Sequence, residues 1–250
     1  MLPLYVVNLD RAPERWEKIS AQLTREGLTP TRFAAIDGSL GQHEAVSRYD
    51  ERAALRRHCL PLLPAELGCF ASHYLLWQRV LESGTAAIVL EDDLRIDPGF
   101  ANVVRLAEDL AQHYPIVRLS ALQQGRTPRC VAALDGGYRL VRHNKGPGGS
   151  QGYMVTPEGA ARFLADSKVW SEPVDDHMDA YWRHGVAALA IVPYRIAHDD
   201  DGQSFIQPPK PLKRSPDAWL RRKLNRRMDR LRAYVWLTTH PPRGEAARNR

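Results

Sequence analysis

Three adjacent carboxylates, Glu91, Asp92 and Asp93, follow directly after an apolar run at residues 86–90. A run of this length is typical of a strand buried on both faces of a parallel sheet. Because three acids cannot lie in that core, they mark the carboxyl end of the strand, where open α/β sheets bind ligands. If the strand geometry continues, Glu91 and Asp93 face one side, where such a pair can hold a hard divalent cation. The alternative is a solvated acidic turn.

Further polar side chains follow the first predicted strand: Asn8, Asp10, Arg11 and Arg15. Arg11 and Arg15 lie one helical turn apart and could hold the oxygens of a diphosphate. Their alternative is a pair of solvated helix charges, and Asn8 could equally be a turn residue at the strand end.

A second acidic pair, Asp175-Asp176, follows a Pro-Val turn and could supply a general base. The alternative, which is compatible with the first, is a helix N-cap with a favourable acid in the first turn. His198 lies at a predicted strand end and could complete a metal shell, because imidazole suits Mn²⁺. His73 shares a helix side with Phe70 and Trp77, where a lone histidine is more often a hydrogen-bonded core residue.

The elements that must position these residues follow from apolar periodicity. A strand at residues 4–9, a helix from 13 to 27 and a strand at 32–36 form a β–α–β unit. Helices are predicted at 64–84, 102–114, from 157 and after 175–176, and strands at 86–90, 116–119, 151–156 and 187–192, with 138–141 as an antiparallel edge candidate. Residues 123–129 and 143–150 are predicted loops. The order indicates a three-layer α/β/α domain over residues 1–207 with a predominantly parallel mixed sheet.

The C-terminal residues 208–250 differ in composition. Residues 210–250 hold 13 of the 35 Lys+Arg and 3 of the 29 Asp+Glu, so the rest of the chain, with 22 and 26, has a net charge of −4. Leu220, Leu224, Met228, Leu231 and Val235 recur at helical spacing, and the opposite face carries Arg221, Arg222, Lys223, Arg226, Arg227 and Arg230. This basic amphipathic helix, residues 215–236, is typical of binding to an anionic membrane surface. Nucleic-acid binding, which we do not expect, and docking on the chain's own acidic domain are the alternatives.

Other motifs bound the possible functions. The first βα turn lacks GxGxxG, and the chain contains no GxxxxGK[ST], GxSxG or HExxH. No stretch reaches the ~20 apolar residues of a membrane span. Three cysteines without a CxxC pair argue against a disulfide framework and a structural zinc site. With no signal-like N-terminus, we expect a cytoplasmic protein.

Four segments in order resemble glycosyltransferase family 25, the lipooligosaccharide-type β-galactosyltransferases of bacteria and their collagen-modifying relatives. They are Tyr5-Val6-Val7-Asn8-Leu9-Asp10-Arg11-x-x-x-Arg15, Glu66-Leu67-Gly68-Cys69-x-x-Ser72-His73, Val89-Leu90-Glu91-Asp92-Asp93 and Gly152-Tyr153 with Gly159-Ala160. Each segment alone is weak, and their common order over residues 4–200 makes the resemblance specific.

The resemblance implies a GT-A-like fold, a UDP-sugar donor, a glycan acceptor and inverting transfer of a hexose, most often galactose. It implies Mn²⁺ (or Mg²⁺) held by the acidic motif, with Asp93 as the first choice of ligand and Glu91 beside it. His198 as a further ligand is predicted from its own position, where the family more often has a glutamine. The implied donor-binding residues are Asn8, Asp10, Arg11, Arg15, Ser72, His73, Glu91, Asp92, Gly152 and Tyr153. Asp175, which matches the family's Pro-Val-Asp, is the preferred catalytic base over Asp176.

We therefore predict a metal-dependent enzyme of bacterial lipopolysaccharide biosynthesis, bound peripherally to the inner face of the membrane. Two alternatives from other classes remain open. One is a metal-dependent phosphoesterase or nucleotidyltransferase that uses the same acidic cluster. The other is an inactive membrane-binding adaptor whose basic helix carries the function.

Overall fold

The computed structural model describes residues 1–41, 43–122, 128–199 and 216–241, with side chains from residue 220 in the last range. The β–α–β start is confirmed: β1 (Leu4–Asn8), α1 (Pro13–Arg25) and β2 (Pro30–Ala34). Proline at the first helical position and Gly27 in the left-handed region after the last turn bound α1, as the sequence predicts. Two short 3-10 turns and α2 (Glu51–His58) occupy the polar segment that follows.

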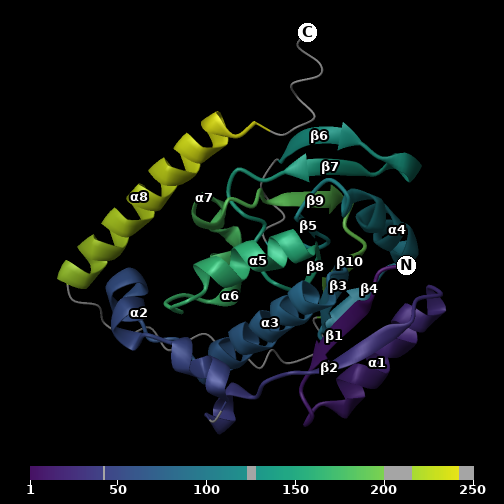
Figure 1. The fold of residues 1–250 in the computed structure, drawn as a ribbon, viewed down its shortest axis with the longest axis horizontal. Coiled ribbons are helices and arrows are strands. Elements are labelled where there is room, and N and C mark those ends of the chain that lie inside the picture. The colour runs from purple at the N-terminus through teal and green to yellow at the C-terminus, as the bar shows by residue number, and fades with distance from the viewer. Residues whose placement is uncertain (42, 123–127, 200–215, 242–250) are drawn as a thin grey trace.

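The remaining elements continue the alternation of helices and strands (Figure 1). They are α3 (Pro64–Ser83), β3 (Ala87–Glu91), β4 (Leu94–Ile96), α4 (Phe100–Leu110), β5 (Ile116–Arg118), β6 (Arg129–Ala133), β7 (Arg139–Arg142), β8 (Gly152–Val155), α5 (Pro157–Asp166), α6 (Val174–Asp179), α7 (Tyr181–His184), β9 (Leu189–Val192), β10 (Ile196–His198) and α8 (Pro216–Thr239). A further 3-10 turn lies at Asp135–Gly137.

Eight strands form one mixed sheet in the order β2-β1-β3-β8-β5-β9-β7-β6. The pairings place β1, β2, β3, β5, β6 and β9 in one direction and β7 and β8 against them, which confirms a predominantly parallel mixed sheet. The predicted strand at 138–141 is β7, which is antiparallel but lies inside the sheet, because β6 forms the edge. The sequence missed β6, which begins inside the predicted loop 123–129.

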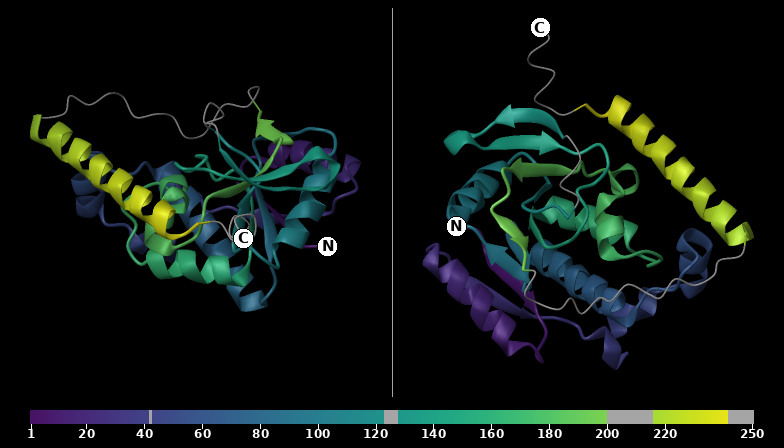
Figure 2. Two further views of the ribbon diagram at one scale, coloured as in Figure 1. Left: turned by 90° about the horizontal axis from the view of Figure 1, so that it is seen from above. Right: turned by 180° about the vertical axis from the view of Figure 1, so that it is seen from behind.

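Helices cover both faces of the sheet, so the domain has three layers (Figures 1 and 2). On one face Ile88 and Leu90 of β3 belong to an apolar cluster with side chains of α1 and α4. On the other face Val89 belongs to a cluster with side chains of α3 and α5. The first four residues of β3 therefore alternate between two cores, and this explains why all four are apolar.

A second, two-stranded sheet joins β4 to β10 in antiparallel register, with His198 opposite Leu94. The backbone N–H of Asp199 continues this pairing by donating to the carbonyl of Asp93 at 2.9 Å. The sequence did not predict this sheet, which brings residues about a hundred positions apart to the acidic motif. The predicted boundary between residues 207 and 208 lies outside the described residues.

Candidate functional site

A cavity of about 450 Å³ lies at the carboxyl ends of β1 and β3, and we call it the strand-end cavity. These strands are parallel neighbours, with Val7 paired to Glu91, so the residues that follow them meet at one edge. The wall combines the start of α1, residues 35–39, the first turns of α3 and the acidic motif, including Arg11, Arg15, Cys69, Ser72, His73, Glu91, Asp92 and Asp93. The sheet edge thus holds the polar residues that the sequence placed there.

Asp92 faces α1. Its carboxylate accepts a hydrogen bond from the Asn8 side chain at 2.6 Å and lies 3.4 Å from the Arg15 guanidinium. Burial nevertheless raises the pKa of Asp92, and the negative charge of Glu91 acts in the same direction. Asn8 is itself buried, and it also donates to the carbonyl of Ala12 and accepts from Arg32. Asn8 therefore fixes the turn from β1 into α1 and orients Asp92.

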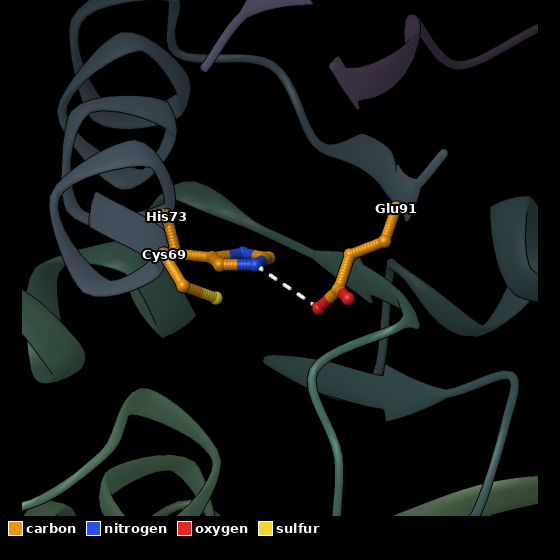
Figure 3. A group of neighbouring side chains, drawn as sticks. All are labelled: Cys69, His73 and Glu91. Atoms are coloured by element: carbon orange, nitrogen blue, oxygen red, sulfur yellow. Dashed lines mark ion pairs between the residues drawn. The ribbon is translucent and has the colours of Figure 1, made fainter. Parts of the chain in front are cut away.

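Glu91 faces the opposite side of the sheet, toward α3 (Figure 3). Its carboxylate accepts a hydrogen bond from the Ser150 hydroxyl at 2.5 Å and lies 3.5 Å from Nε2 of His73. Burial alone would raise the pKa of Glu91, but His73 and Ser150 lower it overall. The prediction that Glu91 and Asp92 point to opposite sides is confirmed by these contacts.

Tyr153 connects Glu91 to the core. Its hydroxyl lies 2.7 Å from Nδ1 of His73 and accepts a hydrogen bond from the Trp77 indole at 3.0 Å. Tyr153 is fully buried, and burial raises the pKa of its hydroxyl. If the hydroxyl donates to Nδ1, the proton of His73 is on Nε2 and points at Glu91. The chain Trp77–Tyr153–His73 therefore holds the Glu91 carboxylate from behind the cavity.

Asp93 lies beside His198 at the end of β10. Its Oδ2 lies 3.6 Å from Nδ1 of His198. Burial and the charge of Glu91 raise the pKa of Asp93 to about 7. Asp93 Oδ1 and His198 Nδ1 are both buried and have no hydrogen-bond partner within the described ranges. A carboxylate and an imidazole left unsatisfied side by side fit the ligand set of a divalent cation such as Mn²⁺.

A second group of possible metal ligands lies beside the first. One ligand atom each from Cys69, His73 and Glu91 lie within 4.8 Å of one another (Figure 3). Cys69 and His73 are one turn apart on α3, the spacing that places two ligands on one helix face. Burial and the charge of Glu91 raise the pKa of the Cys69 thiol well above its usual value. A thiolate would make this a softer site than the one at Asp93.

Another cavity, about 390 Å³, adjoins the strand-end cavity, and we call it the α6 cavity. The two cavities share Cys69, Glu91 and Asp93 in their walls. Asp175, Asp176 and His198 line the α6 cavity as well. Burial and the charges of Asp175 and Glu172 raise the pKa of Asp176 to about 6, in the range suited to a general base near neutral pH.

Several predicted site residues have other surroundings. Asp10 pairs with Arg32 at 2.6 Å and is not in the wall of the strand-end cavity, whereas Arg11, in the wall, pairs with Asp37. Gly152 lies in β8, where an added Cβ would meet Ile196 at 2.4 Å. Gly152 and Tyr153 thus lie behind the cavities, and any direct contact of theirs with a ligand stays a prediction.

The hydroxyl of Ser72, another predicted site residue, donates to the carbonyl of Gly68 and accepts from the N–H of Ile36. Both bonds go to backbone, so Ser72 ties α3 to the segment after β2. The sequence reasoning missed Ser150 and gave Cys69 no role of its own. The spacing of Cys69 and His73 on one helix was a usable signal for Cys69, whereas nothing in the sequence placed Ser150 beside Glu91.

Helix α8 packs along α2 and α7 (Figures 1 and 2). Toward α2 the inner face of α8 is polar: Asp229 pairs with Arg57 at 3.2 Å, and the Asn225 amide donates to the carbonyls of Arg56 and Arg57. Trp236 packs on Tyr181 and under the Arg142 guanidinium. Docking on the chain's own domain, one of the three alternatives, is therefore part of the structure.

The outer face of α8 is the apolar stripe of the sequence analysis. Leu220, Leu224, Met228, Leu231 and Val235 are each about half exposed, between 49% and 56%. Exposed arginines flank the stripe, among them Arg221, Arg227 and Arg230. Arg222 is an exception to the predicted basic face, because it is half-buried against the domain. Among the described residues, no helix is long and apolar enough to cross a membrane.

Comparison of the sequence with known proteins identifies relatives of this chain. The sequence model of a family described as "Glycosyltransferase family 25 (LPS biosynthesis protein)" matches residues 1–178. The chain is 30% identical over 184 residues to a glycosyltransferase 25 family member of Anopheles gambiae, covering 70% of this chain and 31% of the relative. It is 31% identical over 200 residues to procollagen galactosyltransferase 1 of Danio rerio, covering 73% and 32%.

A human relative is named inactive glycosyltransferase 25 family member 3. It is 31% identical over 117 residues, which cover 43% of this chain and 19% of the relative. This chain therefore spans about a third, or less, of the length of these relatives. The matched residues include the whole acidic motif, the α3 side chains and the Asp175-Asp176 pair, whereas β9, β10 and α8 follow the matched segment.

Proposed function

The chain belongs to glycosyltransferase family 25, and on that premise we propose that it transfers a hexose, first of all galactose, from a UDP-sugar to a glycan hydroxyl with inversion. The observation that carries this proposal is the pair of cavities that share the acidic border of Cys69, Glu91 and Asp93. One cavity would hold the nucleotide sugar and the other the acceptor, so that the anomeric carbon lies at the border.

The residues of the strand-end cavity suit a nucleoside diphosphate. Arg15, and Arg11 after release from Asp37, would hold diphosphate oxygens. Asp93 and His198 would hold Mn²⁺ or Mg²⁺, with Glu91 as a further candidate ligand, and the cation would neutralise charge on the leaving diphosphate. Asp92, oriented by Asn8, would accept hydrogen bonds from hydroxyl groups of the donor.

In the α6 cavity Asp176 would take the proton from the attacking hydroxyl. Its pKa near 6 leaves the carboxylate mostly ionised at neutral pH while keeping it basic enough to accept a proton. Asp175, the residue that the sequence favours, would then keep the pKa of Asp176 raised through its negative charge. The two assignments are separable by substitution, as described in the Discussion.

We further propose that α8 binds an anionic membrane surface, so that the acceptor is a lipid-linked cell-surface glycan. The exposed apolar stripe and its flanking arginines support this. The family description names lipopolysaccharide biosynthesis, and lipopolysaccharide assembled on the inner face of a bacterial membrane is our first candidate. The name of the zebrafish relative supports galactose as the transferred sugar and makes a collagen-type acceptor the competing one.

The test is a nucleotide-release screen over UDP-, GDP-, CMP- and ADP-sugars, with Mn²⁺ and with EDTA. Mn²⁺-dependent release of UDP from UDP-galactose is the expected result. Release from another sugar would correct the donor, and release of phosphate or pyrophosphate alone would favour the phosphoesterase or nucleotidyltransferase alternative. If the chain does not turn over any donor and binds neither UDP nor Mn²⁺, the result would favour the adaptor alternative. The name of the inactive human relative makes this alternative worth testing.

A further inference from the structure

A third cavity, about 430 Å³, lies between α8 and the rest of the domain, and we call it the α8 cavity. Asn225 and Arg226 of α8 line one side, and Asp179, Trp182 and Asn144 line the other. Asp176 lines both this cavity and the α6 cavity. The two cavities therefore lie on either side of Asp176.

The polar groups of the α8 cavity are suited to a sugar. Amides, carboxylates and guanidinium groups can each bind vicinal hydroxyls, and an indole can lie against the apolar face of a pyranose ring. The Nε1 of Trp182 is buried and has no hydrogen-bond partner in the part of the chain that the structure describes. It is therefore a donor available to a ligand.

Charge favours a hydroxyl-bearing ligand over a bare anion. Five Lys and Arg residues line the α8 cavity against four Asp and Glu residues. Arg57, one of the five, is already paired with Glu172 at 2.7 Å and with Asp229 at 3.2 Å. An anion site would need a clear excess of positive charge, whereas mixed charges and amides suit the donors and acceptors of a saccharide.

We propose that the α8 cavity is a saccharide subsite for the sugar that precedes the modified residue of the acceptor. The acceptor is then an oligosaccharide of at least two sugars, with its reducing end directed to the side of α8. The inference rests on the proposed function, which it deepens by naming the acceptor class. Because α8 follows the family-matched residues 1–178, the α8 side of this subsite would lie outside the matched segment, whereas Asn144 and Asp176 lie within it.

The test is binding of the full chain to an array of immobilised mono-, di- and trisaccharides, neutral and phosphorylated. We expect disaccharides and longer glycans to bind about tenfold more tightly than monosaccharides. In Trp182→Ala and Arg226→Ala this preference should fall to threefold or less. Arg105→Ala, an exposed arginine on α4 that lines no cavity described above, is the matched control and should keep the preference.

UDP binding, measured on each preparation, reports a folded donor site and separates this proposal from the proposed function. Metal-dependent UDP release by wild type together with no glycan binding, or with equal binding of mono- and disaccharides, overturns the subsite alone. An unchanged length preference in both Trp182→Ala and Arg226→Ala also overturns it. Absence of UDP binding and release from the wild type overturns the proposed function itself.

Discussion

The acidic strand end and helix α8 differ in which of their side chains are buried and which are exposed. At the strand end, Asn8, Asp92, Glu91 and His73 are buried or half-buried, and each contacts a named partner. On α8 the inner face is mixed, with Asp229 and the apolar Ala233 both turned to the domain, and the apolar stripe is left in solvent. The comparison indicates that one region is arranged for a ligand in a cavity and the other for a surface.

The largest effect is expected at Asp93. Asp93→Asn should lower metal-dependent UDP release on the order of 10³-fold, because loss of a charged metal ligand removes several kcal/mol of charge stabilisation. The control is Asp97→Asn. Among the described residues, the Asp97 carboxylate forms an ion pair with the exposed Arg95. Normal Mn²⁺-dependent turnover of the Asp93 variant would show that Asp93 is not a metal ligand.

Asp176→Asn should lower transfer at least about 10²-fold while UDP binding is retained, because the attacking hydroxyl loses its base. In wild type the transfer rate should rise with pH through about 6, since Asp176 accepts a proton only when it is ionised. Asp175→Asn removes a negative neighbour and lowers the pKa of Asp176. The rise of the transfer rate should therefore move to lower pH. Loss of transfer in Asp175→Asn at every pH would instead make Asp175 the base.

On α8, Leu224→Glu combined with Leu231→Glu should weaken binding to anionic vesicles about tenfold or more, because two charges replace apolar contacts with the bilayer. Flotation with vesicles of defined anionic lipid content is the measurement. Leu81→Glu on α3 is a matched control, because Leu81 is also a half-exposed leucine on a helix. Unchanged vesicle binding of the double variant would leave the outer face of α8 without a lipid role.

The smallest effect concerns the attachment of α8. Asp229→Asn removes the ion pair with Arg57 and should lower the free energy of unfolding by about 1 kcal/mol or less. Hydrogen exchange should nevertheless become faster in α8 than in α3, since only α8 loses an attachment. Equal exchange in both helices, or a loss of several kcal/mol, would show that α8 is as integral to the fold as the core helices.

Much of the fold was predictable, because each core element carries its own signal. The alternation of β3 between two cores requires four consecutive apolar residues, and the prolines and glycines around α1 and α3 mark their ends. The edge strand β6 was missed because it is mostly exposed and its small apolar residues follow one another without an alternating pattern. The short strands β4 and β10 were missed because they form by pairing with each other across about a hundred positions, which no local pattern records.

The spacing of residues along the chain is enough to predict that three carboxylates leave a buried strand at a sheet edge, and that the C-terminal helix has one apolar and one basic side. These features are local, because they depend on the spacing of side chains along one element. Folding, in contrast, places His198 against Asp93, joins Ser150 to Glu91 and turns the Asp229 side of α8 to the domain. Those contacts join residues far apart in the chain, and no local pattern records which polar groups will find one another once the sheet has formed.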